Sequence, residues 1–276
     1  MRPYPRAVNT KIMGILNVTP DSFSDGGRLD TVEAAVRTAR QMVAEGASVL
    51  DVGGESTRPG AEEVAVEEEL RRVVPAIDAI RRAFRDEDEE PLISVDTRKP
   101  EVARAAVHAG ADIWNDVSAL TFSERSVDVA AELGCAVILM HSLNLGMAGG
   151  TPDYTDPVAD IRAFLAERMT ACRKAGIDHI TLDPGIGFGK RLEHNLAILA
   201  NVSAFAIDGV PVLIGASRKS FIGKLDGSAV EERLGGSIAT ALLAAQSGAS
   251  VVRVHDVLET KQALVVAEAV SGASGR

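Results

Sequence analysis

Aromatic residues and cysteines are scarce in this chain of 276 residues, in which Phe, Tyr and Trp together make up 4%. The two cysteines, Cys135 and Cys172, predict no disulfide framework, and neither belongs to a Cys/His spacing typical of a metal site. Basic residues are outnumbered, 29 against 39 acidic ones, so the formal net charge of −10 argues against nucleic acid and anionic membranes as general partners. No apolar run reaches the length of a membrane span, and the N-terminus contains no apolar segment. These absences predict a cytoplasmic protein with no nucleic-acid and no membrane partner.

Hydrophobic residues, in contrast, make up 46% of the chain, which is enough for one large core. One pattern recurs five times: the end of a helix, a glycine suited to the left-handed position after it, a short turn and an apolar strand. The copies are AEGASVLDV (44–52), HAGADIWNDV (108–117), ELGCAVILMH (132–141), KAGIDHITLD (174–183) and QSGASVVRVH (246–255). With KIMGILNV, PLISVDT and VPVLIGAS they make eight candidate strands in a single domain, 1–276, with a lead at 1–10 and a frayed tail at 271–276.

Helices are predicted between these strands, among them segments at 30–45, 100–110, 156–174 and 258–270. Nearly continuous Val, Ile and Leu strands that alternate with helices predict a parallel sheet covered on both faces. Eight such units favour an α/β fold of the (β/α)8 TIM-barrel type, whose active site lies at the C-terminal ends of the strands. A doubly wound open sheet is the structural alternative.

The predicted strands all end in polar side chains. These are Asn17, Asp51, Asp96, Asn115 with Asp116, His141, Asp183, Ser217 with Arg218 and Lys219, and Arg253 with His255. The interior of a barrel needs only apolar layers, and each buried carboxylate needs a partner or costs several kcal/mol. Eight polar strand ends that converge on one rim therefore predict a functional site there.

Asp96, Asn115 and Asp183 are acceptors or mixed donor–acceptor groups on strands otherwise made of Ile, Val, Leu and Trp. Such a set suits a neutral, donor-rich heterocycle, because a carboxylate can accept two parallel N–H bonds from an amidine-like edge. Two alternatives stay open: Asp96 could cap the helix that follows it, and Asp183 could form an Asx-turn with the Pro-Gly pair after it. His141 has no nearby nucleophile in the sequence and is interpreted as a satisfied core histidine.

Lys219, Arg253 and His255, with Arg58, are donors suited to phosphate or carboxylate. The alternation in RVHD places Arg253 and His255 on the same side of their strand, where an arginine can also stack on a ring. SRKSFIGK resembles a loop that enters a helix whose free N–H groups attract anions, although Lys219 could also be an ordinary surface residue. DPGIGFGK matches no nucleotide-binding loop and predicts a rigid turn that exposes Phe188.

Seven motifs in fixed order carry a resemblance to a known family. They are MGILNVTPDSFSDGG, DVGGESTRPGA, SVDTRKPEVA, NDVS, LDPGIGFGK, GASRKSFIG and RVHDV, spread over the chain from about Lys11 to Val270. In this order they resemble the dihydropteroate synthase family of pterin-binding TIM barrels. The resemblance implies a transferase of folate biosynthesis that condenses 6-hydroxymethyl-7,8-dihydropterin diphosphate with 4-aminobenzoate to give 7,8-dihydropteroate and pyrophosphate.

The resemblance also implies roles for the matching residues. The pterin would be held by Asp96, Asn115, Asp183 and Lys219, with Arg253 stacked on its face. The diphosphate would be bound by Asn17, Thr57, Arg253 and His255, with Asn17 also a ligand of the cofactor Mg2+. The aminobenzoate pocket would be completed by Phe23, Asp25, Thr57, Arg58, Pro59, Phe188 and Ser220. The residues expected to be catalytic are Asp25, Lys219, Arg253 and His255.

The implied chemistry is dissociative, like an SN1 reaction. The diphosphate leaves once Mg2+ and cationic side chains take up its developing charge, and the aniline nitrogen attacks a pterin methylene cation that Asp25 helps to stabilise. In this family sulfonamide inhibitors compete for the aminobenzoate pocket, and members are commonly homodimers. One stretch departs from the family pattern: SLNLGMAGGTPDY in the loop 142–154 stands where many members carry a shorter MRGTP-like stretch.

Two other functions are compatible with a pterin-binding barrel. A corrinoid-type methyltetrahydrofolate methyltransferase barrel would not need SRK and RVH as a diphosphate clamp. A non-catalytic pterin-binding paralogue would not need the loop motifs DSFSDGG and STRPG. The chain has all four motifs, which favours the synthase.

Overall fold

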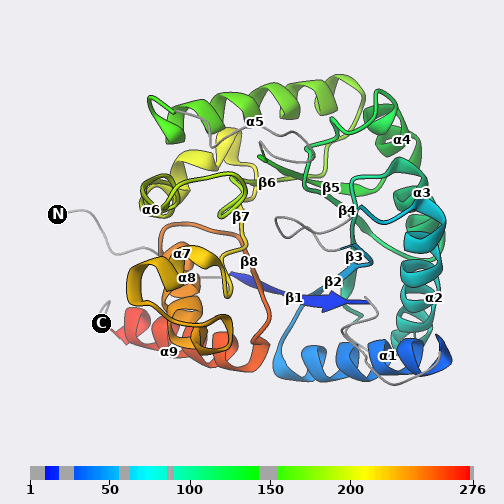
Figure 1. Cartoon of the computed structure of the whole chain (residues 1–276), viewed down its shortest axis with the longest axis horizontal. Coiled ribbons are helices and arrows are strands. Elements are labelled where there is room, and N and C mark those ends of the chain that lie inside the picture. The colour runs from blue at the N-terminus through cyan, green and yellow to red at the C-terminus, as the bar shows by residue number, and fades with distance from the viewer. Residues whose placement is uncertain are drawn as a thin grey trace.

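A computed structural model of the chain describes residues 10–18, 28–55, 63–85, 87, 90–142 and 154–273, with the backbone alone at 28–31. Most of the expected N-terminal lead, the last three residues of the expected tail and most of the loop 142–154 lie outside these ranges. Figure 1 shows strands in the centre of the molecule and helices arranged around them.

Eight strands lie within the described residues, at each of the predicted positions. They are β1 (Lys11–Asn17), β2 (Val49–Gly53), β3 (Leu92–Asp96), β4 (Ile113–Asp116), β5 (Ala136–Met140), β6 (Ile180–Asp183), β7 (Leu213–Ile214) and β8 (Val251–Val254). All their pairings are parallel, in the order β6-β5-β4-β3-β2-β1-β8-β7. The outermost strands of that order meet at a bridge between Leu182 and Val212, where the Leu182 N–H donates to Pro211 O at 2.9 Å. The sheet therefore closes almost completely into a barrel, which confirms the TIM-barrel fold and rules out the open sheet.

The helices form the outer ring of Figure 1. In the described residues they are α1 (Arg28–Glu45), α2 (Val66–Phe84), α3 (Pro100–His108), α4 (Ser126–Leu133), α5 (Pro157–Lys174), α6 (Leu192–Ala200), α7 (Ser220–Asp226), α8 (Leu234–Gln246) and α9 (Val257–Ala273). Local chemistry sets several of their ends. The Asp156 carboxylate accepts from the N–H groups of Val158 and Ala159 and so starts α5, while Gly134 ends α4 with a φ of 62° that favours glycine. None of these helices is long and apolar enough to cross a membrane.

The apolar core has two parts. The larger part fills the space between the barrel and the helices. The smaller part lies inside the barrel and consists of Met13, Val49, Ile138 and Leu213, packed with Ile113 and Val251. Both free cysteines are buried.

The barrel interior changes from apolar to polar toward the C-terminal ends of the strands. Three even-numbered strands show the change two residues apart: Val49 and Asp51 in β2, Ile113 and Asn115 in β4, Val251 and Arg253 in β8. Residues two apart on a strand share a face, and alternate strands of a TIM barrel supply the same interior layer. The topology therefore places Asp51, Asn115 and Arg253 in one polar layer above an apolar floor.

Candidate functional site

Arg253 is the centre of this polar layer. Its Nε donates to Asp51 Oδ2 at 2.5 Å and its Nη2 donates to Asp96 Oδ2 at 2.7 Å. Asn115 Nδ2 donates to both oxygens of Asp51, at 3.3 and 3.2 Å. Asp51 is fully buried, and the Arg253 side chain is 20% exposed. Four strands thus present one bonded cluster of two carboxylates, one guanidinium and one amide, in which the plane of the guanidinium is held by its two carboxylate partners.

The cluster contains two carboxylates but only one guanidinium, and burial together with these charges shifts the pKa values of Asp96 and Arg253. Burial raises the pKa of Asp96 to about 7, Arg253 opposes the rise and Asp51 adds to it. Burial alone would lower the pKa of Arg253, but Asp51 and Asp96 outweigh it and raise that pKa. Arg253 therefore stays charged, and Asp96 is the carboxyl group that can change protonation near neutral pH.

Asp96 also keeps one oxygen available. Its Oδ1 is buried without a hydrogen-bond partner among the described residues, while Oδ2 is bound to Arg253. The alternative role as a helix cap is wrong, because the residue before α3 is Lys99, whose N–H is accepted by Thr97 Oγ1 at 3.2 Å. A buried acceptor without a partner carries a desolvation cost that a ligand N–H would remove.

Asp183, Lys219 and Phe188 form a second group at the same end of the barrel. Asp183 Oδ1 accepts from the Gly185 N–H at 2.7 Å, so the predicted Asx-turn is present. Burial raises the pKa of Asp183, and the charge of Lys219 opposes that rise. Lys219 is not an ordinary surface residue: Nζ donates to Ile186 O and lies 4.3 Å from the centroid of the Phe188 ring.

The charges of the two groups face each other. Burial lowers the pKa of Lys219 to about 8, against the opposing effect of Asp183, and the charges of Arg253 and Asp96 also act on it. Asp183 is likewise affected by Arg253. The structure therefore brings together five of the predicted residues: Asp96, Asn115, Asp183, Lys219 and Arg253.

Three other predicted residues lie at the C-terminal rim. Asn17 is exposed at the end of β1, and its Oδ1 and Asp96 Oδ2 lie 3.8 and 3.9 Å from the point that a Cβ on Gly53 would occupy. His255 follows β8, with its Nδ1 3.0 Å from Ser217 Oγ, and Ser220 is exposed at the first position of α7. The predicted Phe23, Asp25, Thr57, Arg58 and Pro59 lie outside the described residues.

Comparison with known proteins decides the family. The family model described as Pterin binding enzyme matches residues 13–255. The dihydropteroate synthase of Escherichia coli strain K12 is 48% identical over 261 residues, which cover 94% of this chain and 90% of that protein. The chain belongs to the dihydropteroate synthase family.

Solved structures of dihydropteroate synthases agree with this assignment. The Xanthomonas albilineans dihydropteroate synthase with 4-aminobenzoic acid is 51% identical, with a TM-score of 0.86 over 95% of this chain and 93% of that chain. The same species' dihydropteroate synthase in complex with 7,8-dihydropteroate is 48% identical, with a TM-score of 0.84 and the same two coverages. The expected enzyme class is confirmed: the family consists of pterin-binding transferases of folate biosynthesis.

Sequence reasoning gave Asp51 no role, although it noted the polar ending of that strand. In this dihydropteroate synthase fold, Asp51 binds both Asn115 and Arg253. The sequence does contain a pattern that could have indicated this role. Asp51 lies two residues after Val49, as Arg253 lies two residues after Val251, and residues two apart on a strand face the same side.

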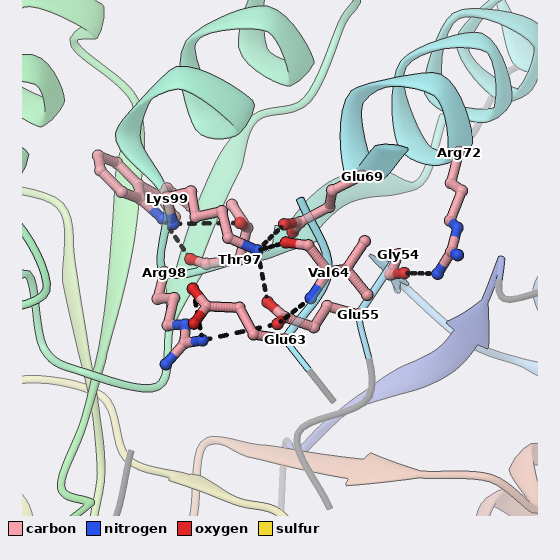
Figure 2. Close-up of polar contacts among 10 residues, drawn as sticks. Gly54, Glu55, Glu63, Val64, Glu69, Arg72, Thr97, Arg98 and Lys99 are labelled. Carbon is pink, nitrogen blue, oxygen red and sulfur yellow. Dashed lines mark hydrogen bonds and ion pairs between the residues drawn. The ribbon is translucent and has the colours of Figure 1, made fainter. Parts of the chain in front are cut away.

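A second buried network, which the sequence did not predict, is centred on Lys99 (Figure 2). Lys99 Nζ donates to Glu69 Oε2 at 2.6 Å, to Val64 O at 2.7 Å and to Glu55 Oε2 at 2.8 Å. Glu55 Oε1 in turn accepts from the Val64 N–H at 3.0 Å. The ammonium group of Lys99, the residue before α3, therefore joins the second residue after β2, the second residue before α2 and the first turn of α2.

His141 only partly matches its interpretation as a satisfied core histidine. It is buried, and its ring packs edge-on against Phe164 at 4.9 Å, as expected for a core residue. However, its Nδ1 has no hydrogen-bond partner within the described part of the chain. Burial lowers the pKa of His141 to about 3, so the ring is neutral at physiological pH.

Proposed function

We propose that this chain condenses 6-hydroxymethyl-7,8-dihydropterin diphosphate with 4-aminobenzoate, releasing pyrophosphate, and that the pterin binds between the Arg253 cluster and the Asp183–Lys219 pair. The observation that carries the proposal is Asp96 Oδ1, an acceptor without a hydrogen-bond partner among the described residues, held on a fixed carboxylate beside a buried amide and a guanidinium. The family assignment and the ligands named for the Xanthomonas proteins support it.

The pterin ring is a flat heterocycle whose N–H groups need acceptors, and this site supplies them. Asp96 and Asp183 offer carboxylate oxygens, and Asn115 offers an amide. A charge-assisted hydrogen bond contributes about 1.5–3 kcal/mol. Arg253, held by Asp51 and Asp96, would present the face of its guanidinium to the ring. Lys219 would exchange the Ile186 carbonyl for an acceptor on the pterin.

The diphosphate would lie at the rim, near Asn17, Arg253 and His255, with Thr57 added from the sequence. Asn17 fits a Mg2+ ion, because its amide oxygen is a hard ligand and its side chain is exposed at the end of β1. Within the described ranges no group of three or more His, Cys, Asp or Glu side chains could hold a metal. A magnesium ion held by Asn17 would, when bound, offset the charge of the leaving group.

The aminobenzoate would be enclosed by Phe188, Ser220 and the residues predicted from the sequence: Phe23, Asp25, Thr57, Arg58 and Pro59. The Phe188 ring supplies an apolar wall, and the Ser220 hydroxyl is a donor for the carboxylate. Sulfonamide inhibitors share the flat aniline ring of 4-aminobenzoate, so we propose that they compete for the same pocket.

The protein's part in the reaction is to stabilise charge and to exclude water. Cleavage of the bond between the methylene carbon and the diphosphate oxygen leaves positive charge on the pterin, which the carboxylates of Asp96, Asp183 and Asp25 would stabilise. Arg253 and His255 would offset the negative charge that develops on the diphosphate. The aniline nitrogen then forms the new C–N bond and loses a proton. No side chain needs to act as a nucleophile.

Release of pyrophosphate tests this function. With the pterin diphosphate as substrate, release should require both 4-aminobenzoate and Mg2+, and 7,8-dihydropteroate should form in equal amount. Release that is equally fast without 4-aminobenzoate would identify a hydrolase, and the proposal would be wrong. A homodimer is also proposed from the family resemblance, and sedimentation of the purified protein tests it.

A further inference from the structure

The loop between β6 and α6 contains a lysine that the reaction outlined above does not use. Lys190 is 7% exposed, and its ammonium group donates to three backbone carbonyls: Gly185 O at 2.7 Å, His141 O at 3.0 Å and Phe188 O at 3.2 Å. Burial lowers the pKa of Lys190 to about 7, which shows that the surroundings disfavour its charge. An apolar side chain would avoid that cost, so the position of this ammonium calls for a physical reason.

The three carbonyls that accept from Lys190 belong to two different segments of the chain. Gly185 and Phe188 belong to the glycine-rich loop 184–189, whereas His141 directly follows β5. The loop lies tightly against that strand end, since a Cβ on Gly185 would come within 2.0 Å of His141 O. Lys190 thus fastens the loop to the neighbouring strand.

The loop's own backbone does little to fix its shape beyond one turn, in which the Phe188 N–H donates to Gly185 O at 3.2 Å. Gly185, Gly187 and Gly189 all have positive φ, at 70°, 85° and 64°, and glycine has more conformations to lose than any other residue. Outside contacts must therefore select this conformation. Lys190 supplies two of them, to Gly185 O and Phe188 O, and Asn195 Oδ1 supplies another by accepting from the Gly187 N–H at 2.7 Å.

The same loop sets the position of two residues in the proposed site. The Gly185 N–H orients the Asp183 carboxylate at 2.7 Å, and Phe188 presents its ring to Lys219. Lys219 also contacts the loop, through Ile186 O. If Lys219 turns to the pterin, as the proposed function requires, that contact is lost while the three bonds of Lys190 remain.

We propose that Lys190 is a positioning residue for the pterin: its ammonium holds the loop 184–189 against the end of β5 and thereby fixes the Asp183 carboxylate and the Phe188 ring for binding. The inference rests on the proposed function, because it assumes that Asp183 contacts the pterin. Loss of one charge-assisted hydrogen bond to a ligand weakens binding by about tenfold to a hundredfold.

The experiment measures the affinity for 6-hydroxymethylpterin by calorimetry in a graded series. Lys190→Gln keeps an amide N–H2 that can reach some of the carbonyls, whereas Lys190→Met keeps no donor. We expect the Kd to rise about tenfold to a hundredfold in Lys190→Met, the equivalent of one lost charge-assisted hydrogen bond, and by less in Lys190→Gln. Amide hydrogen exchange at 185–189 should accelerate in the same order.

A matched control separates positioning from stability. Ile80→Ala removes a fully buried side chain from α2, on the other side of the barrel, and should lower Tm while leaving the Kd unchanged. The inference is overturned if the Kd follows Tm across all three variants, or if it stays at the wild-type value in both Lys190 variants. If Lys190→Met does not fold, Lys190→Gln alone decides between these outcomes.

Asp183→Ala distinguishes failure of the inference from failure of the proposed function. Weaker binding in Asp183→Ala with wild-type binding in the Lys190 variants would refute only the role of Lys190. Wild-type binding in Asp183→Ala would instead remove Asp183 from the pterin site, and both proposals would fall.

Discussion

Replacing Arg253 by methionine should both destabilise the protein and stop the reaction. The guanidinium binds Asp51, which is fully buried, and Asp96, which is 7% exposed. Methionine keeps much of the side-chain volume but leaves both carboxylates without their cation. Removing one partner from a buried ion pair costs about 3–5 kcal/mol, and we expect a loss in the free energy of unfolding of that size at pH 8.5.

The loss in the free energy of unfolding should be smaller at pH 6 because the pKa of Asp96 is raised. Its pKa is about 7 in the folded protein and about 3.9 in an unfolded chain, so the folded state binds the proton more tightly. The stability that this group contributes is therefore present below about pH 4 and is lost as the pH rises to about 7. Arg253 lowers the pKa of Asp96, so this pKa rises further in Arg253→Met. The stability contributed by Asp96 then continues to fall above pH 7, by up to about 1.4 kcal/mol per pH unit.

Urea unfolding followed by circular dichroism, at pH 6 and pH 8.5, measures this difference. Arg104→Met is a matched control, because Arg104 pairs with Glu132 on the surface and should change stability by less than about 1 kcal/mol at either pH. Adding Asp96→Asn to Arg253→Met should recover part of the stability but none of the turnover. An equal loss at both pH values, or wild-type turnover in Arg253→Met, would refute this reasoning.

Three further changes test other parts of the account. Asp183→Ala should weaken pterin binding by about 1.5–3 kcal/mol in calorimetry, because a charge-assisted hydrogen bond is lost; unchanged affinity would contradict the assignment. Arg58→Ala should raise the KM for 4-aminobenzoate more than the KM for the pterin diphosphate, and steady-state kinetics that show no such difference would refute its role. Lys99→Met should lower the free energy of unfolding by about 3–5 kcal/mol because the fully buried Glu69 loses its cation, and adding Glu69→Gln should recover part of it; no loss in urea unfolding would contradict the network.

The fold could be predicted from the sequence because its signals are local and repeated. Each glycine of the recurring pattern has the positive φ that the pattern predicted, with 98° at Gly248 and 85° at Gly176. Apolar strands that alternate with helices then leave few arrangements of the chain. The convergence of Asp96, Asp183 and Arg253 followed from the barrel topology alone.

The partners of these residues could not be predicted in the same way. Asp96 precedes a helix and could have been its cap, and only the register of β3 against its neighbours turns the carboxylate toward Arg253. Lys99 and Lys190 resemble ordinary helix-end and loop lysines in the sequence. Their burial depends on contacts with residues 30 and 49 positions away, to Glu69 and to His141. Such contacts between distant segments leave no local pattern in the chain.

The most direct test of the central claim is a crystal structure of this protein with 6-hydroxymethylpterin bound. We expect the N–H edge of the ring to bind Asp96 Oδ1 and the Asp183 carboxylate, with Lys219 moved from Ile186 O to the ring. A pterin bound elsewhere, with Asp96 Oδ1 still lacking a partner, would contradict it.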